Sequence, residues 1–254
     1  MTTPQQSPAD RRALVVGGST GIGRAVAESW ARTGFDVLVL SRGRPTGDGA
    51  DLLRWSSLDL ADSDGARDAL DRATAGPLDA VCYSAVSYGS RRAPFGDVEE
   101  EEWRRQVEVN LHGLWRTLSA TLPALRRAPA GLFLGISSEV VFNAGPGRSG
   151  YAATKAAGSA LLDSIAQEEG TDGVRIVQAL PAGMVDTPGI RRRRPADFDY
   201  DGYMSPRHFA ALAHALVTEG ATGHHGDSLV VDGDGRWRSV REALPVSQSR
   251  RVPA

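Results

Sequence analysis

The chain of 254 residues contains a single cysteine, Cys82. One cysteine excludes both an internal disulfide and a cysteine-rich metal site. No run approaches the roughly 18 apolar residues of a membrane-spanning helix, and the opening stretch MTTPQQSPADRR lacks the apolar core of a signal peptide. The net charge of −2 provides no basic field for nucleic acid or an anionic membrane. We therefore expect a cytoplasmic protein without nucleic-acid or membrane partners.

The residues that are abundant indicate an ordinary globular protein, with 41% hydrophobic and 24% charged residues. Short apolar runs alternate with stretches of helical spacing. The expected strands are 13–16, 35–40, 52–58, 78–85, 131–137, 173–180 and 227–233, and the expected helices are 21–31, 63–75, about 99–125, 149–169 and 206–218. This alternation predicts an α/β fold, a single doubly wound parallel sheet (Rossmann-like) with helices on both faces. We expect one domain over 12–235, a flexible tail at 1–11 and a C-terminal tail at 236–254.

A glycine-rich segment, GGSTGIG, follows the first expected strand and precedes the first expected helix. It carries Gly17, Gly21 and Gly23. Glycines at such a place allow a tight turn and let the backbone approach a pyrophosphate at the helix N-terminus. A glycine-rich turn that binds nothing remains the alternative.

The stretch SGYAATKAAG carries one tyrosine and one lysine among small residues, Tyr151 and Lys155. Residues four positions apart share one face of a helix. A cation beside a phenol favours the phenolate, so we expect Lys155 to lower the pKa of Tyr151.

Together, the G-x3-G-x-G loop and the downstream Tyr-x3-Lys pair resemble the short-chain dehydrogenase/reductase family over about residues 12–235. The resemblance implies four catalytic residues: Asn110, Ser138, Tyr151 and Lys155. It implies that Tyr151 is the general acid/base and that Ser138 orients the reacting oxygen. Lys155 would hold the nicotinamide ribose, and Asn110 would hold a water that links Lys155 to solvent.

The same resemblance implies a nicotinamide cofactor. At the end of the second strand stand Ser41 and Arg42, with no carboxylate, and arginine matches a 2′-phosphate, so NADP(H) is favoured over NAD(H). An exposed loop arginine is the alternative interpretation. The expected cofactor-binding residues are Gly17, Ser19, Thr20, Gly21, Ile22, Gly23, Ser41, Arg42, Asp59, Leu60, Ser84, Ala85, Val86, Tyr151, Lys155, Gly183, Val185 and Thr187.

One segment departs from the family pattern. Where the family has Asn-Asn-Ala-Gly, this chain has YSAV, residues 83–86. The missing glycine removes a position of close backbone approach, and the missing asparagines remove side-chain hydrogen bonds. This change bears on cofactor affinity but not on the fold.

Residues 187–205 correspond to the family's substrate lid and include four consecutive arginines, Arg191–Arg194. These either bind an acidic substrate or phosphate-bearing carrier, or form a solvated loop that pairs with Asp197, Asp199 and Asp201; charge runs favour the second interpretation. The other lid residues expected to line or cover a pocket are Phe198, Tyr200, Tyr203 and Met204, with Ser87–Phe95 as another wall. We expect no metal, because the adjacent His224 and His225 do not face one way.

The resemblance implies an NADP(H)-dependent oxidoreductase that moves hydride between nicotinamide and a ketone, an aldehyde or a secondary alcohol. A ketoreductase that assembles as a homotetramer or dimer is the preferred form of this hypothesis. One alternative is a non-catalytic NAD(P)-binding sensor or scaffold, which YSAV supports. Another is an S-adenosylmethionine-dependent methyltransferase, in which Tyr151 and Lys155 would have no purpose.

Overall fold

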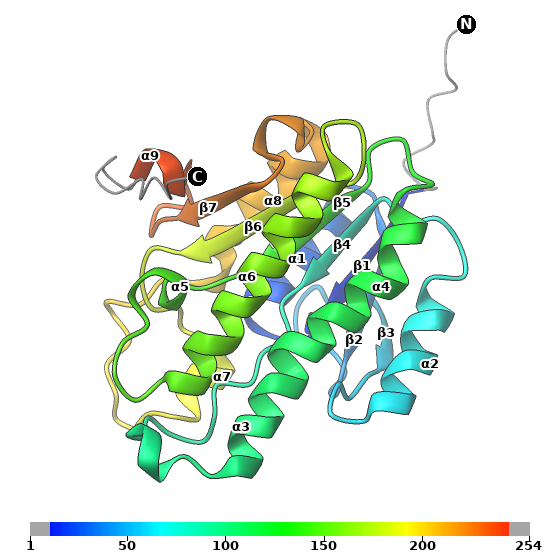
Figure 1. The fold of residues 1–254 in the computed structure, drawn as a ribbon. Helices are drawn as coiled ribbons and strands as arrows, with labels where there is room; N and C mark the ends of the chain where they lie inside the picture. Colours follow the sequence, from blue (N-terminus) through cyan, green and yellow to red (C-terminus); the bar gives the residue numbers. More distant parts are fainter. Residues whose placement is uncertain (1–10, 244–254) are drawn as a thin grey trace, which may run out of the picture.

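A computed structural model describes residues 11–243, and residues 1–10 and 244–254 of the two expected tails lie outside this range. The described residues form one eight-stranded sheet in the order β3-β2-β1-β4-β5-β6-β7-β8 (Figure 1). The strands are β1 (Arg12–Val16), β2 (Asp36–Ser41), β3 (Arg54–Ser57), β4 (Ala80–Tyr83), β5 (Leu132–Ile136), β6 (Arg175–Pro181), β7 (Asp227–Val231) and β8 (Trp237–Ser239). All neighbours pair in parallel except β8, which runs antiparallel to β7. The predicted doubly wound sheet is confirmed.

Helices cover both faces of this sheet, as Figure 1 shows. On one face lie α1 (Gly21–Arg32) and α8 (Phe209–Thr218), which bury Trp30 and Phe209 against the strands. On the other lie α2 (Ser63–Ala73), α4 (Gly113–Leu125) and α6 (Ser149–Glu169), which bury Leu70, Leu118 and Leu162. Because the sheet is buried on both sides, its strands read as continuous apolar runs rather than as alternating ones.

The expected helix over about 99–125 is not continuous. It is divided into α3 (Glu100–Val107) and α4 by a π-helical segment, Glu108–His112, with Asn110 at its centre. A π segment inserts one extra residue into a helix and is frequent at functional sites. The apolar spacing of the sequence runs through this break, so the pattern did not reveal it.

The chain continues the sheet beyond Gly235, inside the range expected to be a tail. After β7, the chain turns back to form β8, and the short helix α9 (Val240–Ala243) follows. The lid region is also more ordered than the expected irregular segment. It contains the short helix α7 (Pro188–Arg191) and a β-bridge between Val185 and Met204. Within residues 11–243, no helix combines the length and the apolar character needed to cross a membrane.

The order of the strands reverses between β1 and β4, since β2 and β3 lie on one side of β1 and β5 to β8 on the other side of β4. In open α/β sheets a ligand binds outside the carboxyl ends of the strands at such a switch point. Val16 ends β1 and Tyr83 ends β4, so the segments that begin at Gly17 and Ser84 meet there.

Candidate active site

A cleft of about 910 Å³ opens at the switch point. This volume lies within the range of small-molecule and cofactor sites. Nearly all of the predicted site residues line it, from the glycine loop, the ends of β2, β4, β5 and β6, and α6. Only Gly23 and Asn110 of the predicted set do not line the cleft.

The glycine loop forms one wall of the cleft. Gly17 and Gly21 have φ angles of +84° and +61°, which L side chains rarely adopt. A Cβ on Gly17 would lie 2.4 Å from the backbone nitrogen of Ala85, and one on Gly23 would lie 2.5 Å from the carbonyl oxygen of Gly17. Gly17 therefore lets the loop pass against β4, while Gly23 serves packing inside the loop rather than contact with the cleft.

The first turn of α1 faces this cleft. Thr20 is its N-cap residue, and no side chain caps the helix by a hydrogen bond. The first N–H groups of a helix have no partner within the helix and attract anions. Gly21, at the start of this helix, lies against Thr187. A Cβ on Gly21 would be 3.2 Å from the methyl carbon of Thr187. This arrangement fits the pyrophosphate of a dinucleotide.

The YSAV segment replaces the family's asparagines with a different set of bonds. Buried Tyr83 donates a hydrogen bond to the carbonyl oxygen of Val109, just before Asn110 in the π segment. The amide of Ser84 donates to the carbonyl oxygen of Val16 at 2.8 Å, which extends the pairing of β1 and β4. Tyr83 is accommodated because Gly113 lies opposite, where a Cβ would be 2.6 Å from the Tyr83 hydroxyl. The departure therefore leaves the cleft open.

One end of the cleft is formed by the end of β2, where the ribose of the cofactor is expected. Arg42 is exposed and lines the cleft, and no described carboxylate lies within 4.0 Å of it. Its neighbour Arg44 instead lies over the ring of Trp55, at 6.0 Å, and does not line the cleft. Ser41 is buried and accepts a hydrogen bond from the Trp55 indole at 3.2 Å. Of the two arginines, Arg42 is thus the one available to a ligand.

Two further predicted positions, Asp59 and Leu60, follow the end of β3. Asp59 is exposed and accepts a hydrogen bond from the amide of Ala61 at 3.0 Å, and Leu60 is buried beside it. Asp62, not Asp59, caps α2 by accepting from the amide of Gly65. Since Asp59 lines the cleft and does not cap the helix, one of its carboxylate oxygens remains available for a ligand.

Tyr151 and Lys155 lie on the same buried face of α6 and both line the cleft. The Lys155 ammonium donates to the carbonyl oxygen of Ile136 at 2.7 Å. Burial lowers the pKa of Lys155 to about 8. Burial also raises the pKa of the Tyr151 phenol well above its ordinary value, helped by Tyr88 and opposed by the Ser138 hydroxyl. In the chain alone, burial therefore outweighs the expected effect of Lys155 on Tyr151, and the phenol is protonated.

Ser138 lies two residues after the end of β5, beside Tyr151, and is buried. Its hydroxyl donates to the carboxylate of Glu139 at 2.6 Å, and Arg148 pairs with the other oxygen of that carboxylate at 2.9 Å. Both charged residues line the cleft. Sequence reasoning missed Glu139 and Arg148, because no spacing rule links a residue next to Ser138 with the residue before α6.

Asn110 lies behind the cleft, with its amide fully engaged. Its oxygen accepts from the amide of Ser87 at 2.7 Å, and its nitrogen donates to the carbonyl oxygen of Ser87 and to the hydroxyl of Thr154. The side chain thus ties the segment after β4 to α6, next to Lys155. The expected role of Asn110 in holding a water stays a prediction.

The lid residues differ from expectation. Phe198, Tyr200 and Tyr203 pack on one another, with ring centroids 4.9 to 5.6 Å apart, and neither they nor Met204 line the cleft. They therefore do not line the cleft, because the three rings bury one another, and their role in covering it stays a prediction. The lid side of the cleft is formed instead by Gly189, Ile190 and three arginines. From β6 onward, Gly183, Val185 and Thr187 line the cleft as expected.

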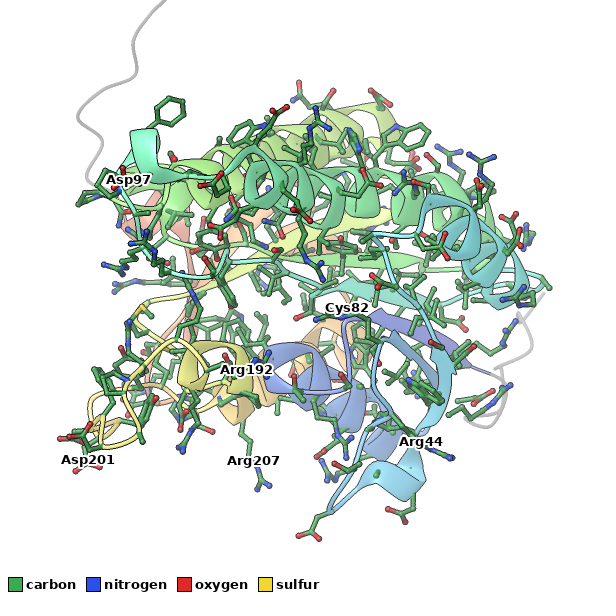
Figure 2. All side chains as sticks on the ribbon, turned by 90° about the horizontal axis from the view of Figure 1, so that it is seen from below. Arg44, Cys82, Asp97, Arg192, Asp201 and Arg207 are labelled. Atoms are coloured by element: carbon green, nitrogen blue, oxygen red, sulfur yellow. The ribbon has the colours of Figure 1, made fainter. Side chains whose placement is uncertain are left out.

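The four lid arginines do not pair with the downstream aspartates. Arg191 forms a bidentate ion pair with Asp186 at 2.6 Å, and no described ion pair joins Arg191–Arg194 to Asp197, Asp199 or Asp201. Asp201 stands at the outer edge of the lid segment, whereas Arg192 lies nearer the centre of the molecule (Figure 2). The pairing expected from sequence is therefore wrong, since local chain direction separates the two groups.

A comparison with known proteins agrees with this geometry. Residues 11–197 match the model of the short chain dehydrogenase family. The chain is 29% identical to an uncharacterised NAD-dependent oxidoreductase of Mycobacterium tuberculosis, over 87% of this chain and 94% of that protein. It is also 29% identical to cis-4-hydroxycyclohexanecarboxylate dehydrogenase of Sinomonas cyclohexanicum, over 89% and 96%.

Solved structures show the same fold. A Beutenbergia cavernae protein, whose proposed activity is NAD(P)-dependent gluconate 5-dehydrogenase, is 28% identical and superposes with a TM-score of 0.75, covering 89% of this chain and 96% of that one. The matched range includes the glycine loop, Ser138, Tyr151 and Lys155. The chain therefore belongs to the short chain dehydrogenase family of NAD(P)-dependent oxidoreductases.

Proposed function

We propose that the protein is an NADP(H)-dependent ketoreductase in which Tyr151 is the general acid/base. The observation that carries this proposal is the convergence of Ser138, Tyr151 and Lys155 on the same cleft as the glycine loop. When bound, the nicotinamide cofactor supplies or accepts a hydride. Two features support the fit of this cofactor to the cleft. One is the space beside Gly17, which a Cβ would fill, and the other is the first turn of α1, which no side chain caps.

The residues of the chain would handle the proton. The protonated Tyr151 phenol donates its proton to a carbonyl oxygen during reduction, and the phenolate accepts it from an alcohol in the reverse direction. Ser138 holds the same oxygen by a hydrogen bond, which requires its hydroxyl to leave Glu139. The Lys155 ammonium, free of any described carboxylate within 4.0 Å, stabilises the phenolate left behind and binds ribose hydroxyls.

The proposed substrates are small ketones, aldehydes and secondary alcohols. One relative is named as a dehydrogenase of a hydroxycyclohexane carboxylate, which is a secondary alcohol. Oxidation of a secondary alcohol to a ketone is the reverse of the ketone reduction proposed here.

The preference for NADP(H) rests on Arg42. The relatives do not decide it, since one is named NAD-dependent and the Beutenbergia structure holds NADP at low occupancy. We expect nicotinamide fluorescence titration to give a Kd for NADPH roughly tenfold or more below that for NADH, because a charged hydrogen bond contributes about 1.5–3 kcal/mol. Arg42→Ala should weaken NADPH binding by roughly that factor and leave NADH binding unchanged.

The control for this titration is Arg44→Ala, which removes an equal charge from the same loop outside the cleft. Arg44→Ala should leave the dissociation constants for NADPH and NADH within about twofold of the wild-type values, since an exposed charge is largely screened. Equal weakening by the two variants would contradict a specific phosphate contact. Tighter binding of NADH by the wild type would overturn the NADP(H) preference and leave the oxidoreductase proposal standing.

Ketone reduction should lose activity at alkaline pH. The pKa of Lys155 is lowered to about 8, so the ammonium is lost as the pH rises through that value, while the raised pKa of Tyr151 keeps the phenol protonated. We expect kcat to fall about tenfold per pH unit above this inflection. Lys155→Arg, which stays charged, should be slower but show no inflection near pH 8. A flat wild-type profile up to pH 10 would contradict this role of Lys155.

We also propose a homo-oligomer, either a dimer or a tetramer. Trp115 on α4 is 57% exposed and Trp103 on α3 is 37% exposed. Helix α6 packs against Trp103 at Gly150 and exposes a row of alanines, Ala153, Ala156, Ala157 and Ala160. Contiguous exposed apolar residues mark protein interfaces. Light scattering that gave only the monomer mass would contradict the proposal.

The cytoplasmic location expected from sequence stays a proposal, to be tested by cell fractionation.

A further inference from the structure

The four consecutive arginines of the lid have four different surroundings. Two of them are held inside the lid. Arg191 pairs with Asp186 and stacks on Tyr200, at 4.5 Å, and Arg194 bonds the Tyr203 hydroxyl at 3.1 Å and stacks on Phe198, at 5.1 Å. These two arginines hold the aromatic cluster of the lid together.

The other two, Arg192 and Arg193, line the cleft, as Arg194 also does. Arg192 is exposed, whereas Arg193 is only partly exposed and has its guanidinium 5.5 Å from the centre of the Tyr88 ring. The Nε atom of Arg193 is buried and has no hydrogen-bond partner. No described carboxylate lies within 4.0 Å of this guanidinium. A buried donor without a partner costs about 1–3 kcal/mol, and Arg24 and Arg148 each carry one such atom as well.

The charges around Arg193 do not supply that partner. Arg92 and Arg194 also line the cleft and act electrostatically on Arg193, opposed by Glu102. The Oε2 atom of Glu102 accepts hydrogen bonds from the amide and hydroxyl of Ser90, not from Arg193. With two further arginines against one carboxylate, this wall of the cleft around Arg193 is net positive and favours an anion over a neutral or cationic group.

Tyr88 connects this positive wall to Tyr151. Its ring packs at a tilt against the Tyr151 ring, with centroids 5.1 Å apart, and the Arg193 guanidinium lies 5.5 Å from the centre of the same ring. Gly189 brings the lid onto the same ring, since a Cβ there would lie 3.3 Å from it. Tyr88 therefore contacts both Tyr151, where the reacting oxygen would lie, and Arg193.

We infer that Arg193 binds the carboxylate of the substrate, so that the enzyme acts on keto acids and the matching hydroxy acids. This inference rests on the proposed oxidoreductase function. The planar fork of a guanidinium matches a carboxylate in two parallel hydrogen bonds. The carboxylate would bind the terminal Nη1 and Nη2 atoms of Arg193, because the Nε atom is closed to solvent, and it would fix the distance between the anionic end and the carbonyl group. Arg193 is then the residue that determines substrate class, while Tyr151 and Ser138 act on the carbonyl.

The test compares each keto acid with its methyl ester, which has the same carbonyl but no charge. Two pairs are used, levulinate with methyl levulinate and 4-oxocyclohexanecarboxylate with its methyl ester. Binding to the NADP⁺ complex is measured by titration calorimetry, since a ketone meets no hydride there and binding is separated from turnover. For at least one pair, the acid should bind the wild type roughly tenfold to hundredfold more tightly than the ester.

Arg193→Gln should remove this preference while NADP⁺ affinity and melting temperature stay unchanged. Arg193→Lys should keep only part of it, because the charge remains and the fork is lost. Arg207→Gln is the matched control, because Arg207 is exposed and does not line the cleft, and it should keep the preference within about twofold.

Several results would overturn the inference: equal binding of acid and ester, binding of neither member of either pair, or equal losses in the two glutamine variants. Turnover of a neutral ketone without acid preference would overturn it and leave the oxidoreductase proposal intact. An Arg193-dependent acid preference without any turnover would support carboxylate binding by Arg193 and overturn the oxidoreductase proposal.

Discussion

Tyr151→Phe should lower kcat for ketone reduction by about 10²–10⁴-fold, the contribution typical of a positioned general acid. The reason is that the phenol proton is lost while the ring remains. Phe keeps the stacking against Tyr88, at 5.1 Å between centroids, so the shape of the cleft should persist. Stopped-flow or steady-state absorbance at 340 nm, with NADPH and any ketone that the wild type reduces, measures this loss.

The matched control for this substitution is Tyr200→Phe. It removes a phenol hydroxyl from the lid cluster, outside the cleft. We expect it to leave kcat within about threefold, and both variants should bind NADPH as the wild type does. Retention of more than a tenth of wild-type kcat by Tyr151→Phe would refute Tyr151 as the acid.

Gly17→Ala should abolish measurable NADPH binding and lower the melting temperature by about 5 °C or more. Two effects combine here. The φ of +84° costs an alanine about 1–3 kcal/mol, and its Cβ would lie 2.4 Å from the backbone of Ala85, where overpacking costs about 1–3 kcal/mol. In a domain of this size, each kcal/mol shifts the melting temperature by about 2–4 °C. Thermal unfolding and fluorescence titration measure the two results.

Gly223→Ala provides the comparison, because a Cβ there meets no atom within 4 Å and its φ is not positive. It should leave both the melting temperature and the NADPH affinity at wild-type values. If Gly17→Ala bound NADPH with wild-type affinity, the glycine loop would not be the pyrophosphate cradle, and the proposed position of the cofactor would be wrong.

The fold was largely predictable because each buried strand is a short apolar run bounded by turn residues. For β1 and β2, the expected strands 13–16 and 35–40 differ from the observed bounds by one residue at each end at most. Two features escaped this reasoning. The π segment at Glu108–His112 leaves the apolar spacing continuous, and β8 has only three residues, too few to show a period.

The candidate site was predictable where chemistry follows from position along the chain. Tyr151, Lys155, Ser138 and the glycine loop meet in one cleft because they stand at the ends of parallel strands or on a helix beside them. Contacts between distant segments were not predictable. The pairing of Glu139 with Arg148 depends on tertiary packing, as do the stacking of Tyr88 on Tyr151 and the separate surroundings of the lid arginines. Side-chain pKa values depend on burial for the same reason, which is why Tyr151 differs from expectation.

The central claim, that this cleft transfers hydride between NADPH and a carbonyl compound, is tested most directly by NADPH oxidation at 340 nm. The wild-type protein is mixed with NADPH and a panel of keto acids, neutral ketones and aldehydes, and the reverse reaction is followed with NADP⁺ and the matching alcohols. We predict carbonyl-dependent loss of absorbance that Tyr151→Phe removes. Tight NADPH binding with no turnover in either direction would contradict the claim and favour a non-catalytic sensor or scaffold.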